Sequence, residues 1–159
     1  MMPTAIQTQI EHAVDQLFDQ QVALLCDLVR IPSLRGQEAP CQDRVAATLR
    51  QMGYAVDQWQ LNVEDLQHHP GFSPVMYTTY DRAYSVVGTH RPRTQQGRSL
   101  ILQGHVDIVP TGPVEQWTSP PFVPTLRDGW LYGRAAGDMK SGLTANLFAV
   151  EALLWYKGP

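Results

Sequence analysis

Residues 100–110, LILQGHVDIVP, constrain the fold of this chain more than any other stretch. The stretch opens with three consecutive apolar residues, and such a short apolar run predicts a buried β-strand, here over residues 99–109. Pro110 ends the strand, because proline has no N–H to donate to a neighbouring strand. Just before this end lie two titratable residues, His105 and Asp107. The stretch therefore predicts a buried strand with polar groups at its carboxyl end.

Apolar residues recur at helical spacing in three other parts of the chain. Residues 5–30 predict one long helix or two abutting helices, with Thr4 as the N-cap. Residues 40–52 predict a helix that stops at Gly53, and residues 139–156 predict one that stops at the final Gly-Pro pair. The expected inward positions are Ile6, Ile10, Val14, Leu17, Val22, Leu25 and Leu28 in the first helix, Val45, Leu49 and Met52 in the second, and Leu143, Leu147, Val150 and Leu154 in the third.

The remaining segments predict strands and loops. Residues 54–61 and 83–90 are rich in β-forming residues and predict strands. Residues 62–82 are polar and predict a loop, and the five prolines of residues 110–127 predict an ordered loop or a sheet edge. The sequence RDGWLYG, residues 127–133, predicts a turn and a short strand. The order is helix, helix, three strands, loop, short strand, helix, which is typical of a layered α/β domain.

Charge and composition exclude several classes of partner. The chain has 159 residues, 12 basic and 15 acidic, with a formal net charge of -3 and no basic block. This balance argues against binding to nucleic acid or to an anionic membrane. Every 18-residue window carries a charge, and the N-terminus lacks the basic region of a signal peptide, so we expect no membrane span and a cytoplasmic location. A disulfide between the two cysteines, Cys26 and Cys41, is disfavoured in that compartment.

His105 and Asp107 can be interpreted in two ways. Residues two apart in a strand point to the same face, and sites in α/β sheets gather beyond the carboxyl ends of the strands. A neutral imidazole placed there can bind a metal, and a nearby carboxylate can orient it through the other ring nitrogen. The alternative is a hydrogen-bonded histidine with an aspartate that caps a loop. The His-x-Asp pattern taken alone favours this alternative.

A second cluster lies in LYGRAAGDMKSG, residues 131–142. Asp138 stands there in a turn of small residues immediately before the last predicted helix, and these residues permit close backbone approach. An aspartate in this position can serve as a helix N-cap. It can equally be a metal ligand, and its two oxygens can bridge two cations. Together with His105, Asp138 shifts the balance towards a metal site.

At this point the sequence resembles a known family. LILQGHVDIVP and DGWLYGRAAGDMKSG, with QWTSPPF between them, are similar to the motifs of the M20 metallopeptidases and deacylases. LVRIPSLRGQE and VAATLRQMGY resemble the opening helices of that family. The resemblance implies a layered α/β/α catalytic domain of the zinc-dependent exopeptidase type with an incomplete sheet. Residues 1–159 would be the N-terminal portion of that domain, without the separate lid and dimerisation domain.

The resemblance also implies roles for matching residues. His105 would bind one divalent metal, Asp138 would bridge two, and Asp107 would take part in catalysis by orienting His105. The metal would be zinc or cobalt, with two ions in the intact family site. The peptide bond between Asp138 and Met139 would be cis. Two family glycines are replaced by small residues, Ala135 and Ser141, which need not disturb the turn.

The implied activity is hydrolysis of the amide bond of an N-acyl amino acid, as in acetylornithine deacetylase, by a full-length homodimer. A dipeptidase or carboxypeptidase of the same family, acting on a peptide, is an alternative. A non-catalytic α/β fragment or partner-binding module is another. The family's glutamate pair, which supplies the general base and a ligand, has no counterpart here: Glu151 follows Asp138 too closely, and Glu115 and Asp128 lie in predicted loops. We therefore expect the 159-residue chain to be inactive by itself.

Overall fold

The computed structural model describes residues 4–73, 84–94 and 96–157. The chain divides into two compact units, each assembled from separate stretches of sequence. Met1–Arg30, Leu100–His105 and Thr111–Pro159 form the first, here called the helical unit. Ile31–Ser99 and Val106–Pro110 form the second, the mixed unit. Both units contain helices and strands, which confirms the predicted α/β class. In the described residues, no helix has the length and apolar character that a membrane crossing requires.

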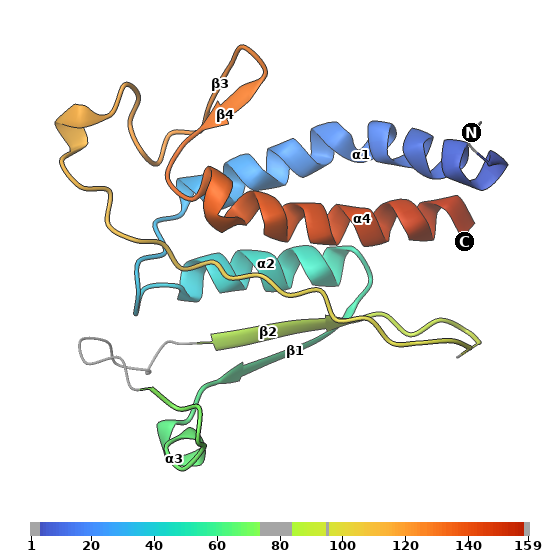
Figure 1. Cartoon of the computed structure of the whole chain (residues 1–159), viewed down its shortest axis with the longest axis horizontal. Helices are drawn as coiled ribbons and strands as arrows, with labels where there is room; N and C mark the ends of the chain where they lie inside the picture. Colours follow the sequence, from blue (N-terminus) through green and yellow to red (C-terminus); the bar gives the residue numbers. More distant parts are fainter. Residues whose placement is uncertain (1–3, 74–83, 95, 158–159) are drawn as a thin grey trace. The chain divides into compact units, whose positions relative to one another are not determined.

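The helical unit is built on two long helices that lie side by side, α1 (Ala5–Arg30) and α4 (Ser141–Lys157) (Figure 1). The predicted N-cap is confirmed, because the Gln7 N–H donates to Thr4 Oγ1 at 3.3 Å. The prediction that Ile6 and Val14 face inward is wrong, since both are exposed. The buried face of α1 runs instead through Ala13 and then through Leu24, Leu25, Leu28 and Val29.

Helix α4 buries a different face from the one predicted. Its buried face carries residues spaced by four positions, Thr144, Phe148 and Ala152. The predicted inward residues are only partly buried. Apolar residues surround the helix, so their spacing does not single out one side. The helix also begins later than predicted, at Ser141, because Asp138 and Met139 have non-helical backbone angles.

A proline-rich segment connects to a tight hairpin in the same unit. The segment contains one short helical turn, η1 (Val114–Gln116). The hairpin pairs β3 (Thr125–Arg127) with β4 (Trp130–Tyr132), where the sequence predicted a turn and one strand. Asp128 and Gly129 form its two-residue loop with φ of 53° and 79°, as expected for the Asp-Gly turns that match the twist of antiparallel strands.

The mixed unit packs one helix on a two-stranded antiparallel sheet (Figure 1). Helix α2 (Ala39–Gln51) covers β1 (Ala55–Gln60) and β2 (Tyr84–Thr89), and a short helix, α3 (Val63–Leu66), follows β1. The predicted stop at Gly53 is confirmed: its φ is 83°, and its N–H donates to the Arg50 carbonyl. Helix and sheet approach closely, because a Cβ built on Gly88 would lie 2.6 Å from Leu49 Cδ2.

The predicted buried strand over residues 99–109 is wrong. Within the described residues this stretch forms one isolated parallel bridge, between Ile108 and Leu34. Leu100 is 77% exposed and Ile101 is 89% exposed. An apolar run gives a preference for extended structure, but a strand forms only where a neighbouring strand supplies the hydrogen-bonding partners. The described part of the chain provides that partner at Leu34 and not along residues 100–105.

Candidate metal centre

Asp138 lies in a tight turn, η2 (Ala136–Lys140), that comes directly before α4. The Lys140 N–H donates to the Ala135 carbonyl at 3.1 Å, which closes the turn. Ala135 has a φ of 67°, in the left-handed region that glycine adopts most readily. The peptide bond between Asp138 and Met139 is cis, as the resemblance implied. The turn leaves the Asp138 side chain 93% exposed.

The end of α1 holds this turn from one side. Ala136 packs with Leu25 and Val29, and Leu131 of β4 covers the same cluster. A Cβ built on Gly133 would lie 2.6 Å from Val29 Cγ1, so glycine is required at this close approach. This confirms the prediction that small residues let the backbone come close here.

His105 faces Asp138 within the helical unit. Its Nε2 lies 3.3 Å from Asp138 Oδ1, and the His105 side chain is 47% exposed. The residues before it pack on α4: Asn146 Nδ2 donates to the Gln103 carbonyl at 3.1 Å, and a Cβ on Gly104 would lie 3.3 Å from Leu143 Cδ1. The structure therefore brings together the two residues that the sequence singled out as metal ligands.

The spacing of these two donor atoms fits a shared metal ion. Two ligand atoms that bind one tetrahedral zinc ion, each at about 2.0–2.1 Å, lie about 3.3 Å apart. An imidazole nitrogen with a carboxylate oxygen is a ligand set that zinc accepts. Among the described residues, no group of three or more His, Cys, Asp or Glu side chains gathers at one place. His105 and Asp138 are thus a ligand pair rather than a complete site.

Asp107 belongs to the mixed unit, where it lies beside Arg35. Arg35 Nε is 3.7 Å from Asp107 Oδ2, and the two side chains are 63% and 35% exposed. Ser33 is fully buried; its Oγ donates to the Val106 carbonyl, and its own carbonyl accepts from the Ile108 N–H at 3.0 Å. Sequence reasoning missed Ser33 and Arg35. Both residues follow the first predicted helix, and nothing in the sequence there signals a partner more than seventy positions away.

Several aromatic and histidine side chains outside this pair have packing contacts. Trp117 Nε1 donates to the Thr111 carbonyl at 2.9 Å, and the Arg134 guanidinium lies 5.0 Å from the Trp117 ring centroid. These contacts make Trp117 a packing residue of the proline-rich segment. His12 lies against Trp155 and His90 against Tyr54, with ring centroids 6.1 and 6.2 Å apart.

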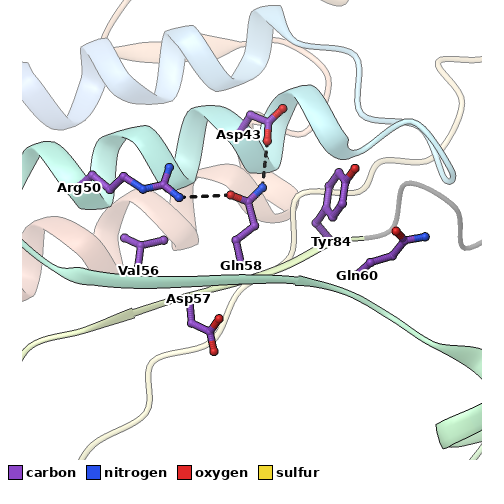
Figure 2. A pocket seen from close by; sticks show the side chains of 7 residues that line it. All are labelled: Asp43, Arg50, Val56, Asp57, Gln58, Gln60 and Tyr84. Carbon is purple, nitrogen blue, oxygen red and sulfur yellow. Dashed lines mark hydrogen bonds between the residues drawn. The ribbon is translucent and has the colours of Figure 1, made fainter.

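The mixed unit also carries a shallow polar pocket, beside α2 and the sheet (Figure 2). Gln58 crosses it: its Nε2 donates to Asp43 Oδ1 at 3.0 Å, and its Oε1 accepts from Arg50 at 3.4 Å. Figure 2 shows Asp57, the neighbour of Gln58 on β1, pointing to the opposite side of the strand. None of the three predicted site residues lines this pocket.

The fold is similar to that of part of a longer solved chain. The crystal structure of human carnosine dipeptidase 1 matches 96% of this chain and 32% of its own length, with a TM-score of 0.57 and 22% sequence identity. This likeness defines the class of fold, an α/β fold found in a dipeptidase.

Sequence comparisons identify the family. Residues 101–158 match the model of peptidase family M20/M25/M40. The chain is 39% identical over 127 residues to a succinyl-diaminopimelate desuccinylase of Delftia acidovorans. This match covers 80% of this chain and 29% of the relative. It is 35% identical over 141 residues to the succinyl-diaminopimelate desuccinylase of Xylella fastidiosa. This match covers 89% of this chain and 30% of the relative. The chain belongs to the M20/M25/M40 peptidase family, and it spans about 30% of the length of these relatives.

Proposed function

We propose that this chain carries one part of the metal centre of an amide-bond hydrolase. The observation that supports it is the 3.3 Å approach of His105 Nε2 to Asp138 Oδ1, inside the segment that matches the family model. In this proposal His105 and Asp138 hold a divalent ion, zinc or cobalt, and Asp138 has a second oxygen with which to bridge a second ion. The role that the resemblance implies for Asp107 is to orient His105. A divalent ion held by His105 and Asp138 would supply polarisation of an amide carbonyl and activation of water.

The substrate class that we propose is an N-acyl amino acid. The relatives of 35–39% identity are named for removal of a succinyl group, so we favour an N-succinyl amino acid over the N-acetyl substrate suggested by the motifs. The side chains of the pair are 47% exposed at His105 and 93% exposed at Asp138, so neither is buried in the protein interior. The general base and the further ligands would come from residues outside this sequence, in a longer homodimeric and cytoplasmic protein with a lid and dimerisation domain. Residues 1–159 would be the N-terminal portion of its catalytic domain.

The proposal is tested by titrating the chain with Co²⁺, whose visible absorption reports its ligands, and with Zn²⁺. We expect His105→Ala and Asp138→Ala each to weaken binding by at least about tenfold, because each removes one of two protein ligands. His12→Ala serves as the matched control, since the His12 ring lies against Trp155 of α4. Binding that both site variants leave unchanged would reject the site. A wild-type chain that binds neither metal would favour the non-catalytic module.

Assays for activity separate the remaining alternatives. We expect no hydrolysis by the 159-residue chain alone. A longer form that contains the missing ligands should be compared on N-succinyl and N-acetyl amino acids and on dipeptides. Faster turnover of dipeptides would replace the deacylase proposal with the dipeptidase alternative.

A further inference from the structure

Lys140 is a fully buried lysine that the proposed chemistry does not use. Its side chain is 0% exposed, and its Nζ donates to the Leu28 carbonyl at 2.8 Å. Lysine is almost never fully buried unless its charge is paired or hydrogen-bonded. Leu28 lies in the last turn of α1, where carbonyl groups have no partner within the helix and the helix dipole is negative. The Lys140 ammonium group therefore donates to a carbonyl that has no partner within the helix. The negative end of the helix dipole also favours a positive charge at this position.

The same residue also closes the turn that carries Asp138. Its backbone N–H donates to the Ala135 carbonyl at 3.1 Å, and it follows Asp138 by two positions. The Asp138 side chain is 93% exposed, so side-chain packing does little to fix its direction. Its position depends on the backbone of the turn, and Lys140 joins that backbone to the end of α1. All of these groups belong to the helical unit.

We propose that Lys140 is a positioning residue: its hydrogen bond to the Leu28 carbonyl holds the turn so that Asp138 Oδ1 stays opposite His105 Nε2. The part of this inference that concerns metal binding rests on the proposed function. The competing explanation is that Lys140 only fills space between α1 and α4. Methionine has a similar unbranched stem without the donor, so Lys140→Met distinguishes the two explanations.

The first measurement needs no metal. Hydrogen exchange of the Lys140 amide, which is protected by the Ala135 carbonyl, reports whether the turn is held. We expect exchange across residues 135–140 to quicken in Lys140→Met and to return towards wild type in Lys140→Arg, which restores a cationic donor. Phe148→Leu is the matched control, because Phe148 is 6% exposed on α4 and does not belong to the turn. This control should quicken exchange in α4 and leave the turn unchanged.

Two exchange results would overturn the proposal. One is a turn in Lys140→Met that is as protected as in wild type. The other is a loss of protection in the turn of Phe148→Leu that equals the loss in Lys140→Met, when the two variants have the same free energy of unfolding. If Lys140→Met does not fold, Lys140→Gln replaces it, because glutamine keeps a neutral donor but is shorter. Its turn should also exchange faster than that of wild type, and unchanged protection would again contradict the proposal.

The second measurement is Co²⁺ affinity of the same variants. Mutation of a residue that orients a metal ligand typically lowers metal affinity about tenfold or more. We therefore expect Co²⁺ affinity to fall by that factor in Lys140→Met and to recover in part in Lys140→Arg. Phe148→Leu should keep the wild-type affinity. A loosened turn with unchanged Co²⁺ affinity would show that Lys140 does not position Asp138. Failure of the wild-type chain to bind Co²⁺ would reject the proposed function, and the exchange result would still decide whether Lys140 holds the turn.

Discussion

The two segments that carry the candidate ligands are held in very different ways. Residues 133–140 are packed against the end of α1, with Ala135, Ala136 and Lys140 all buried. Residues 100–105 begin with side chains that are among the most exposed apolar groups of the chain and gain support only near Gln103 and Gly104. A candidate ligand can thus be held by a turn that is packed against a neighbouring helix, or by an extended segment that is supported only near its end.

If close packing fixes the turn, Gly133→Ala should have the largest effect on stability among substitutions in residues 100–105 and 133–140. The added Cβ would lie 2.6 Å from Val29 Cγ1, and Val29 is fully buried and has no room to move. We expect a loss of about 1–3 kcal/mol in the free energy of unfolding, measured by urea denaturation. Gly137→Ala is the control, because nothing lies within 4 Å of its Cβ position, and it should stay within about 0.5 kcal/mol. Equal effects of the two variants would contradict the packing argument.

The positive φ of Ala135 predicts a smaller effect of opposite sign. A non-glycine residue at a φ of 67° costs about 1–2 kcal/mol, and glycine avoids this cost. Two effects oppose the gain: the substitution removes a buried methyl group, and a glycine loses more conformational entropy on folding than an alanine. Ala135→Gly should therefore leave stability unchanged or raise it by up to about 0.5 kcal/mol. Ala136→Gly, at a neighbouring buried position without that φ, should lose about 1 kcal/mol. Thermal unfolding of both variants checks the difference, and a larger loss in Ala135→Gly would refute it.

The smallest effect is expected in the exposed segment. Ile101 is 89% exposed, so Ile101→Ser should change the free energy of unfolding by no more than about 0.5 kcal/mol. Ile108 is the matched control, because it is the same residue type in the same stretch but only 4% exposed; Ile108→Ser should lose about 2–5 kcal/mol. Urea denaturation compares the two. A large loss in Ile101→Ser would show that residues 100–102 are buried in solution.

Local signals were enough to predict several elements of the fold. Thr4 caps α1 and Gly53 ends α2 because each acts on backbone groups a few residues away. These two features need no knowledge of the rest of the chain. The turn before α4 was also predicted, from the small residues around Asp138, but the reason that Gly133 is small is its close approach to Val29, which is distant in sequence.

The errors arose where distant contacts decide the outcome. The strand over residues 99–109 requires a partner strand, and the apolar run does not reveal whether one is present. The buried face of α4 depends on where α1 lies, because the helix is apolar on most sides. For the site, His105 and Asp138 were predicted as a pair from their residue types, while Ser33 and Lys140 were missed, because each contacts a residue far away in sequence.

Three residues in the last two turns of α1, Leu25, Leu28 and Val29, contact residues 133–140. Removing one residue from a helix rotates the part on one side of the deletion by about 100° relative to the part on the other side. Insertions and deletions before Ala13, the first buried residue of α1, would leave the final turns in register with residues 133–140. One such change between Leu25 and Arg30 would turn these contacts away from the turn. The length of α1 is therefore free to vary at one end during evolution and is fixed at the other.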